Sequence, residues 1–366
     1  MPERGVPPNV HPLQRRVLRA LEAFSTPLLP DDYLEMINPL WSTRELRGRI
    51  ERIDRETPDA ATVLIKPGYS WRGHKPGQFL RIGVDIDGVR HWRAYSLTSD
   101  PYRPDGLIGV TVKCVDAGKV SPYLVCRGRA GAIVSLGGVE GDFVLPEPPP
   151  EQLLFITAGS GITPIMSMLR HLDNADAVED VVMLHSARET DLVIFGAELR
   201  ELAARRERFR LHEQLTRAYG RMGPADLDRM CPDWRKRETY ISGPSEMLDA
   251  FSEHFDTHGD SDRLHTERFQ PRLGLGEAAE GEGGSILFCK SGCEASSDGS
   301  KPILVAGEDE GLELPYGCRE GICHTCVGEL VSGRVRDLRN GKVYGQEGEM
   351  VRTCISAPEG PIEIDL

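Results

Sequence analysis

The sequence predicts three successive folding parts: an antiparallel β-barrel, a parallel-sheet α/β domain and a small β-grasp-like domain that carries cysteines. Residues 42–147 hold short alternating apolar runs separated by glycine and proline, which is typical of short strands closed into a barrel. Residues 148–270 alternate strand-like and helix-like segments, the order of a parallel sheet. Near the C-terminus stands the cysteine spacing C-x4-C-x2-C. The fold class is therefore multidomain, α/β plus β, in a chain of 366 residues, which is long enough for two or three domains.

Charge is distributed unevenly along the chain. The net charge is −13, and residues 271–366 contribute −8 of it, from 9 Lys/Arg and 17 Asp/Glu. This balance argues against nucleic acid as a partner. It suits either a redox domain that is steered to a basic docking face or a merely solvated acidic surface, and both interpretations stay open. No apolar run reaches the roughly 18 residues of a membrane span, and the start has no apolar signal segment, so we expect a cytoplasmic protein.

Residues 1–41 are expected to form a helical extension. One stripe of a first helix is apolar, and a second short helix is expected from Asp31 toward Trp41, ending at the Asn38–Pro39 pair. We favour a first helix that packs on the body of the protein over one that lies on a membrane surface, because its stripe is narrow. That stripe consists of Leu13, Val17, Leu21 and Phe24.

A glycine-rich turn at residues 159–164 (Gly-Ser-Gly-Ile-Thr-Pro) lies between an expected strand at 153–157 and an expected helix. Gly159 and Gly161 allow the backbone to approach a pyrophosphate, and the helix N-terminus offers free N–H groups to the anion. Pro164 suits the first helical turn, where its missing N–H is not needed. The motif indicates dinucleotide binding, with a purely structural turn as the alternative.

The next expected strand ends at Arg188, and a helix is expected over residues 191–205. In dinucleotide-binding folds an acidic residue at this strand tip favours NAD, whereas arginine accommodates the 2′-phosphate of NADP. Arg188 therefore favours NADPH, and Arg217 and Arg221 are further cations that could reach a phosphate. The alternative is that these arginines are merely solvated.

The cysteine loop belongs to residues 285–366, which follow a glycine-rich linker at 271–284. Its cysteines, with a fourth one after a gap of 27 residues, have the spacing of the four thiolate ligands of a plant-type [2Fe–2S] cluster. Structural zinc usually uses two close cysteine pairs, and intracellular thiols stay reduced, so zinc and disulfides are the weaker alternatives. The expected metal ligands are Cys318, Cys323, Cys326 and Cys354. The remaining cysteines, expected to be mostly buried thiols, are Cys114, Cys126, Cys231, Cys289 and Cys293.

A stretch in the barrel region, residues 93–99 (Arg-Ala-Tyr-Ser-Leu-Thr-Ser), completes an ordered set of motifs. Together with the turn at 159–164, the Gly243–Pro244 pair before a helix, and the cysteine loop, it resembles the ferredoxin–NADP reductase superfamily. More narrowly, residues 42–366 are similar to reductases with a C-terminal [2Fe–2S] domain. The N-terminal extension, with Asn-Pro-Leu-Trp at 38–41, resembles the actinobacterial-type reductases that serve fatty-acid desaturases.

The resemblance implies FAD in the barrel. Arg93 would pair with the FAD pyrophosphate, Tyr95 would stack on the isoalloxazine, and Ser96 would hydrogen-bond flavin N5. A second flavin and phosphate segment would comprise Lys113, Gly118 and Ser121.

The resemblance also places residues beside the nicotinamide. Thr163 would lie near the nicotinamide end, with Gly243 and Pro244 in the last nucleotide motif. The family commonly has cysteine where this chain has Ser242. A hydroxyl still lines the hydride path, but the softer sulfur contact with the nicotinamide is lost.

The expected function is electron transfer from NADPH through FAD and a [2Fe–2S] cluster to a terminal oxygen-activating enzyme. The favoured acceptor is a fatty-acid desaturase or hydroxylase, with peripheral association to a membrane-bound partner. The alternative is an NADH-dependent reductase component of a Rieske-type aromatic or steroid oxygenase. A remote alternative of another class is a non-catalytic redox-sensing or zinc-binding module.

Overall fold

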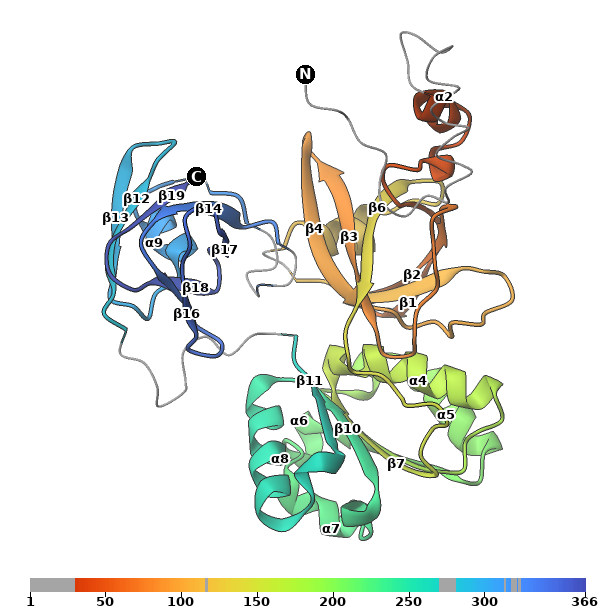
Figure 1. Ribbon diagram of the computed structural model, residues 1–366. Helices are drawn as coiled ribbons and strands as arrows, with labels where there is room; N and C mark the ends of the chain where they lie inside the picture. Colours follow the sequence, from red (N-terminus) through yellow and green to blue (C-terminus); the bar gives the residue numbers. More distant parts are fainter. Residues whose placement is uncertain (1–29, 116–117, 270–280, 313, 317–320, 322–323) are drawn as a thin grey trace. The chain divides into compact units, whose positions relative to one another are not determined.

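The computed structural model describes residues 30–115, 118–269, 281–312, 314–316, 321 and 324–366. The chain forms two compact units, one of Met1–His91 with Tyr95–Glu267 and the other of Trp92–Ala94 with Arg268–Leu366 (Figure 1). No helix in the described part of the chain is long and apolar enough to cross a membrane. The apolar stripe expected at residues 13–24 lies outside the described residues.

In the described residues of the larger unit the first elements are the helix α2 (Pro30–Ile37) and the 3-10 turn η1 (Pro39–Trp41). The Asn38 side chain accepts a hydrogen bond from Leu40 N at 3.0 Å, and Pro39 has no N–H with which to continue α2. The Asn38–Pro39 pair therefore ends the helix, as predicted.

The predicted antiparallel barrel is confirmed. Its strands are β1 (Arg47–Thr57), β2 (Ala60–Pro67), β3 (Phe79–Ile86), β4 (Val89–Ser96), β5 (Ile108–Lys113) and β6 (Ile133–Glu140), in the order β4-β3-β6-β1-β2-β5. A bridge between Leu97, directly after β4, and Val110 in β5 joins the two end strands. Fully buried side chains such as Ile50, Val63 and Leu80 fill the interior. A short helical segment, α3 (Val120–Pro122) and η2 (Tyr123–Arg127), follows β5.

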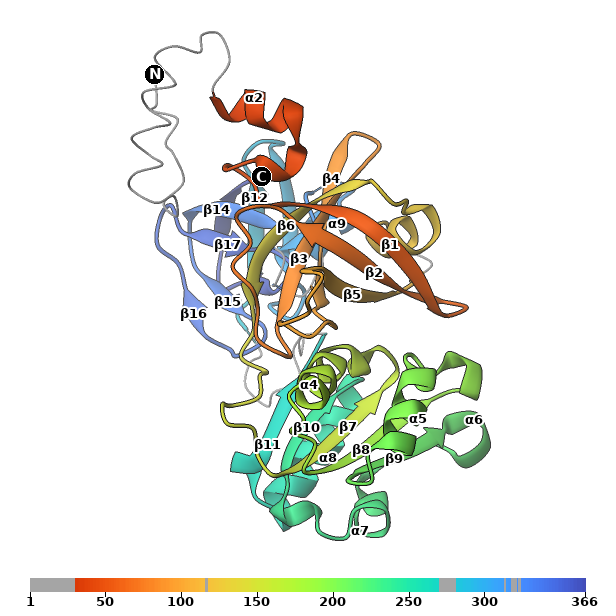
Figure 2. The same ribbon diagram turned by 90° about the vertical axis from the view of Figure 1, so that its right-hand side faces the viewer.

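The predicted parallel sheet is also confirmed. Its strands are β7 (Gln152–Ala158), β8 (Asp180–Ala187), β9 (Phe209–Leu215), β10 (Glu238–Ser242) and β11 (Leu264–Glu267), in the order β11-β10-β7-β8-β9. Neighbouring residues of a strand face opposite sides of the sheet. Phe155 packs with α4 (Ile162–Asn174) and α5 (Gly196–Arg205), whereas Ile156 packs with α7 (Leu227–Met230) and α8 (Ser245–His258) (Figure 2).

The helix predicted over residues 191–205 begins only at Gly196. A 3-10 turn, η4 (Thr190–Leu192), precedes it, and Phe195 has a φ of +61°, which interrupts a helix. The Phe195 side chain is 2 % exposed and belongs to the core beneath α4. Burial of this ring therefore overrides the local helix propensity.

The smaller unit is the predicted small β domain. It has a mixed sheet of order β13-β12-β19-β14-β17, a second sheet of order β16-β15-β18 and the helix α9 (Ile303–Asp309). β12 and β19 pair in parallel. The strands are β12 (Gly284–Phe288), β13 (Cys293–Ser297), β14 (Val327–Ser332), β15 (Val335–Asp337), β16 (Val343–Tyr344), β17 (Met350–Arg352), β18 (Ser356–Pro358) and β19 (Ile362–Asp365).

The expectation of mostly buried thiols outside the cysteine loop was wrong. Cys231 is buried, Cys114 and Cys293 are half-buried, and Cys126 and Cys289 are exposed. Cys289 lies in the turn between β12 and β13, where a side chain has little to pack against.

Candidate active site and cluster loop

The residues predicted to bind the flavin lie at the end of β4. Tyr95 packs against the barrel core, and Ser96 is 6 % exposed. Arg93 donates to the carbonyl oxygen of Trp92 at 2.8 Å and has no carboxylate partner among the described residues. A half-buried guanidinium without a carboxylate fits a bound pyrophosphate.

The second predicted flavin segment runs from the end of β5 into the short helical segment α3, which contains Ser121. Ser121 is 9 % exposed, and its Oγ accepts a hydrogen bond from Val115 N at 3.2 Å. A Cβ on Gly118 would lie 3.0 Å from this Oγ, so the turn is tight. A tight turn that opens a helical segment fits a phosphate. Lys113, which was also predicted to bind the flavin or its phosphate, forms an ion pair with Asp59, with 3.3 Å between Nζ and Oδ2.

The glycine-rich turn forms η3 (Gly159–Gly161) and leads directly into α4. Gly159 has a φ of +54°, and a Cβ there would meet no atom within 4 Å. A Cβ on Gly161 would lie 2.2 Å from the carbonyl oxygen of Ser242, so this part of the turn is pressed onto β10. The open backbone at Gly159, at the start of a helix, is a cradle that fits a pyrophosphate.

Two further predicted residues occupy the first turn of α4. Thr163 is 4 % exposed and its Oγ1 donates to the carbonyl oxygen of Ser160 at 2.9 Å. Pro164 is buried beside it, where the helix needs no N–H. The hydrogen bond from Thr163 stabilises the turn itself.

Ser242 ends β10 and is fully buried, and its hydroxyl has no hydrogen-bond partner among the described residues. Parallel pairing places it between Thr157 of β7 and Glu267 of β11. Burial raises the pKa of Glu267 to about 7. An unpartnered hydroxyl beside a carboxyl group that titrates near neutrality is typical of a functional site.

Gly243 and Pro244 connect β10 to α8. A Cβ on Gly243 would lie 2.7 Å from Met247 Cε and 3.3 Å from Ala158 Cβ. Pro244 stands at the N-cap position of α8. The glycine therefore allows α8 to lie close to the nucleotide turn.

The residue of β8 that pairs with Thr157 of β7 is also polar, and it is His185. The Thr157 Oγ1 and His185 Nδ1 atoms are hydrogen-bonded at 2.7 Å, and the two residues are paired across the strands. His185 is fully buried, and its Nε2 has no partner among the described residues. Burial lowers the pKa of His185 to about 4, so its ring is neutral at physiological pH.

The arginines predicted to reach a 2′-phosphate follow β8 and β9. Arg188 is exposed and has no carboxylate partner among the described residues. The backbone N–H of Arg217 donates to the carbonyl oxygen of Arg188 at 3.2 Å, which brings the two residues together. The Arg217 side chain pairs with Glu189, and Arg221 pairs with Glu246 at the surface.

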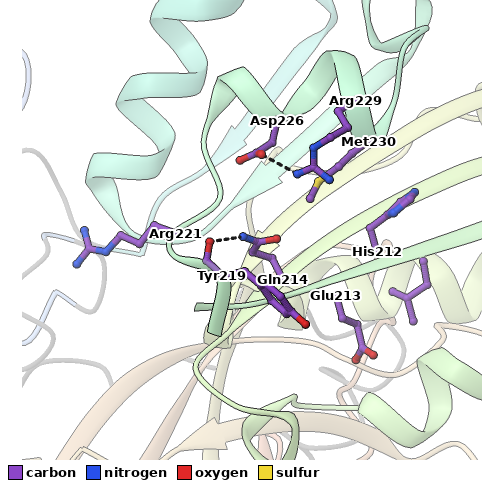
Figure 3. A pocket seen from close by; sticks show the side chains of 9 residues that line it. His212, Glu213, Gln214, Tyr219, Arg221, Asp226, Arg229 and Met230 are labelled. Atoms are coloured by element: carbon purple, nitrogen blue, oxygen red, sulfur yellow. Dashed lines mark hydrogen bonds and ion pairs between the residues drawn. The ribbon is translucent and has the colours of Figure 1, made fainter. Parts of the chain in front are cut away.

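A cavity of about 750 Å³ lies beside β9 (Figure 3). Gln214 Nε2 donates to the carbonyl oxygen of Tyr219 at 3.2 Å, and Arg229 pairs with Asp226 at 2.8 Å. In the figure Arg221 extends away from the other lining side chains. A volume of this size holds a small ligand, and both arginines of the lining are paired with carboxylates, Arg229 with Asp226 and Arg221 with Glu246. The lining residues are Leu211, His212, Glu213, Gln214, Tyr219, Arg221, Asp226, Arg229 and Met230.

Two of the four predicted cluster ligands lie in the core of the smaller unit. Cys326 is 1 % and Cys354 is 3 % exposed. Thr353 connects their segments, because its N and Oγ1 donate to the carbonyl oxygen of Cys326 at 3.0 and 2.7 Å. Two buried cysteines on adjoining segments fit cluster ligands. The other two predicted ligands, Cys318 and Cys323, lie outside the described residues.

The structure thus brings Gly161, Thr163 and Ser242 together at the carboxyl end of the parallel sheet. Sequence reasoning did not single out His185 or Glu267. Each is a polar residue at the carboxyl end of a strand, which is a detectable signal in an open α/β sheet.

Three segments match known domain families. Residues 68–145 match the oxidoreductase FAD-binding domain, residues 155–253 match the oxidoreductase NAD-binding domain, and residues 286–359 match the 2Fe-2S iron-sulfur cluster binding domain.

Whole-chain relatives span all three segments. The chain is 45% identical over 359 residues to an NADPH oxidoreductase of Mycobacterium tuberculosis, covering 97% of this chain and 93% of the relative. It is 31% identical over 362 residues to the glycine betaine monooxygenase reductase subunit of Pseudomonas aeruginosa, covering 90% and 98%. Its fold is similar to that of phthalate dioxygenase reductase, at 20% identity and a TM-score of 0.54 over 87% of this chain and 97% of that one.

Proposed function

Since the chain belongs to the ferredoxin–NADP reductase superfamily, as an NAD(P)H oxidoreductase with FAD and a [2Fe–2S] cluster, we propose that it is the reductase component of an oxygenase system and uses NADPH. One observation carries this proposal: the likeness to a monooxygenase reductase subunit extends over 90% of this chain and 98% of that one. Bound FAD would supply the hydride-accepting group, and a bound cluster would supply the one-electron outlet. The family match of residues 286–359 favours that cluster over zinc.

The residues of the α/β domain would bind and orient the nucleotide. The open backbone at Gly159 and the N-terminus of α4 would hold the pyrophosphate. Thr163 and Ser242 would border the nicotinamide, and their burial would keep water from the hydride path. On the barrel, Tyr95 and Ser96 would position the flavin ring.

The preference for NADPH is supported by charge. Arg188 has no carboxylate partner among the described residues, so it is available to a 2′-phosphate. Arg217 lies next to Arg188, although the Arg217 side chain forms an ion pair with Glu189. A relative at 45% identity is an NADPH oxidoreductase, which agrees with this charge pattern. Steady-state assays should therefore give a larger kcat/KM with NADPH than with NADH, and a preference for NADH would contradict the proposal.

The acceptor is the second part of the proposal. Of the two relatives and the structure named above, two are oxygenase reductases by name and none is named for a desaturase, so an oxygenase is favoured over the fatty-acid desaturase expected from the N-terminal extension. The desaturase stays as the second candidate because of that extension, residues 1–41, with its Asn-Pro-Leu-Trp stretch at 38–41. The acidic balance of the smaller domain suits a basic docking face on either acceptor.

Reconstitution distinguishes the two acceptors. The purified reductase and NADPH are mixed with candidate oxygenase components or with a membrane-bound desaturase, and product is measured against NADPH consumed. Coupled product formation with an oxygenase supports the proposal. Coupling with the desaturase alone, while reduction of an artificial one-electron acceptor proceeds normally, would identify the desaturase as the partner.

A further inference from the structure

The segment that directly follows β4, residues 98–100, is held by side chains of α4. Ser167 Oγ donates to the carbonyl oxygen of Ser99 at 2.7 Å, and Arg170 Nη1 donates to that of Thr98 at 2.7 Å. Thr98 and Ser99 are at most 1 % exposed. Because buried carbonyl groups cannot turn to water, these bonds are costly to break.

Asp100 makes the second half of this contact. Its carboxylate is 7 % exposed, and Oδ2 accepts a hydrogen bond from Asn174 Nδ2 at 2.7 Å. The other oxygen, Oδ1, lies 3.2 Å from His171 Nδ1. Each oxygen thus meets a different side chain of α4, so the contact fixes orientation as well as distance. We call residues 98–100, with Ser167, Arg170, His171 and Asn174, the latch.

The barrel holds its side of the latch firmly. Thr98 N donates to the carbonyl oxygen of Gly109 at 2.8 Å, and Gly109 N donates to Ser99 Oγ at 3.0 Å. His74 Nε2 lies 3.2 Å from the carbonyl oxygen of Ser99. Ser96, predicted to meet flavin N5, stands two residues before Thr98. The latch is therefore continuous with the flavin strand.

The helix side of the latch is continuous with the nucleotide turn. Ser167, His171 and Asn174 follow Thr163 at spacings of four, four and three residues, which places all four side chains on one face of α4. Ser167 lies about 6 Å along the helix from Thr163, at 1.5 Å per residue. A shift of the latch would therefore move the turn that borders the nicotinamide.

Much of the remaining contact between the barrel and the α/β domain is apolar. Phe143 and Leu145 of the barrel side join the core beneath α4, and a Cβ on Gly77 would lie 2.5 Å from Met168 Cε. Apolar packing has no preferred direction, whereas hydrogen bonds do. The latch, together with the hydrogen bond from Tyr240 OH to the carbonyl oxygen of Val144 at 3.2 Å, thus supplies directional contacts, and those of the latch are the ones that bind α4 itself to the segment after the flavin strand.

We propose that Asp100 is a positioning residue for hydride transfer. Together with Asn174 it holds the first turn of α4 at a set distance from the flavin strand, and so sets the distance from nicotinamide to flavin. The latch residues lie on α4 and in the segment after β4, whereas Arg188 follows β8. Their loss therefore lowers the rate constant of hydride transfer and leaves NADPH affinity nearly unchanged.

Rapid anaerobic mixing of the FAD- and cluster-loaded protein with NADPH measures both constants. In Asp100→Asn only one acceptor oxygen remains: if it keeps the bond from Asn174 Nδ2, an NH2 group replaces the oxygen that accepts from Tyr102 N and faces His171 Nδ1. The rate constant should therefore fall by about 10- to 100-fold, the effect expected of a misplacement on the order of 1 Å. The Kd for NADPH should stay within about twofold. The double variant Asp100→Asn with Asn174→Asp restores a carboxylate–amide pair in reverse, and the rate should return to within about threefold of the parent.

Asp173→Asn is the matched control. Asp173 is a carboxylate of the same helix, but its partners Arg205 and Arg206 belong to the α/β domain. This variant should keep the parent rate. A readout without turnover is hydrogen exchange at the amides of Thr98 and Gly109 in the protein without NADPH, which should accelerate in Asp100→Asn and not in Asp173→Asn.

Three results would overturn the proposal. Asp100→Asn could keep the parent rate while the exchange at Thr98 rises, which would make the latch structural only. Asp173→Asn could slow hydride transfer as much as Asp100→Asn. The swapped pair could fold and bind NADPH without recovering the rate.

Discussion

The two ends of the nucleotide site differ in burial and charge. At the end with Ser242 and Glu267, an unpartnered hydroxyl and a carboxyl group with a raised pKa lie among buried residues, and desolvation is the cause of the raised pKa. At the end with Arg188 and Arg217, cations lie at the surface. Buried polar groups act on geometry and protonation, whereas exposed charges act on attraction and on the choice of ligand. The molecule therefore separates hydride chemistry from nucleotide recognition.

The largest loss of hydride-transfer rate is expected from a substitution in the glycine-rich turn, residues 159–161. In Gly161→Ala the new Cβ would meet a backbone oxygen 2.2 Å away, so the turn must move. Hydride transfer should fall more than about 100-fold, and unfolding in urea should show a loss of about 2–3 kcal/mol.

Gly159→Ala is the control for space, because its Cβ would meet nothing within 4 Å. Only its φ of +54° is unfavourable, at about 1–2 kcal/mol. Equal free energies of unfolding for the two alanine variants would show that the close approach of Gly161 to Ser242 does not destabilise the Gly161→Ala variant.

A smaller effect is expected from Arg188→Ala. Removing one charge-assisted hydrogen bond to a 2′-phosphate should lower kcat/KM for NADPH by about 10- to 100-fold, since such bonds contribute roughly 1.5–3 kcal/mol. The value for NADH should stay within about twofold. Arg208→Ala, at the amino end of β9 and paired with Glu179, is the control and should change neither value. An equal fall of kcat/KM with NADPH and NADH would show that Arg188 does not recognise the 2′-phosphate.

Glu267→Gln tests the buried end through stability. The folded-state pKa of Glu267, raised by burial from 4.5 to about 7, means that the fold binds the proton more tightly than the unfolded chain does. This contribution is fully present below pH 4.5 and is lost as pH rises through 7. The glutamine variant should therefore be more stable than the parent at pH 8 by about 1–2 kcal/mol, discounted for partial exposure, and nearly equal at pH 4. If the free energy of unfolding in urea changed with pH in the same way for Glu267→Gln and the parent, the raised pKa of Glu267 would be contradicted.

The smallest effect is expected from Ser242→Cys. A polarizable sulfur in place of an unpartnered hydroxyl should contact the nicotinamide better and raise the hydride-transfer rate constant about threefold in stopped-flow measurements. An unchanged rate constant would make Ser242 a bystander at the buried end.

The sequence predicted what is local. The turn at Gly159–Pro164 and the end of α2 at Asn38–Pro39 depend on glycine and proline geometry within a few residues, and the parallel and antiparallel sheets follow from residue patterning.

Contacts between distant segments were not predictable in this way. Glu267 meets Ser242 only because β11 pairs with β10 in one particular register. Asp100 meets α4 only because the barrel packs against that helix, and Phe195 leaves the helical region because its ring is buried. Register and packing are decided by the whole fold, so no local motif carries them.

One stopped-flow experiment tests the separation of the two ends most directly. The Kd for NADPH and the limiting rate constant of hydride transfer are measured for Asp100→Asn and Arg188→Ala. We predict that Asp100→Asn lowers the rate constant with little change in Kd, and that Arg188→Ala raises Kd with little change in the rate constant. If both variants changed the same constant, recognition and hydride chemistry would not be separate in this protein.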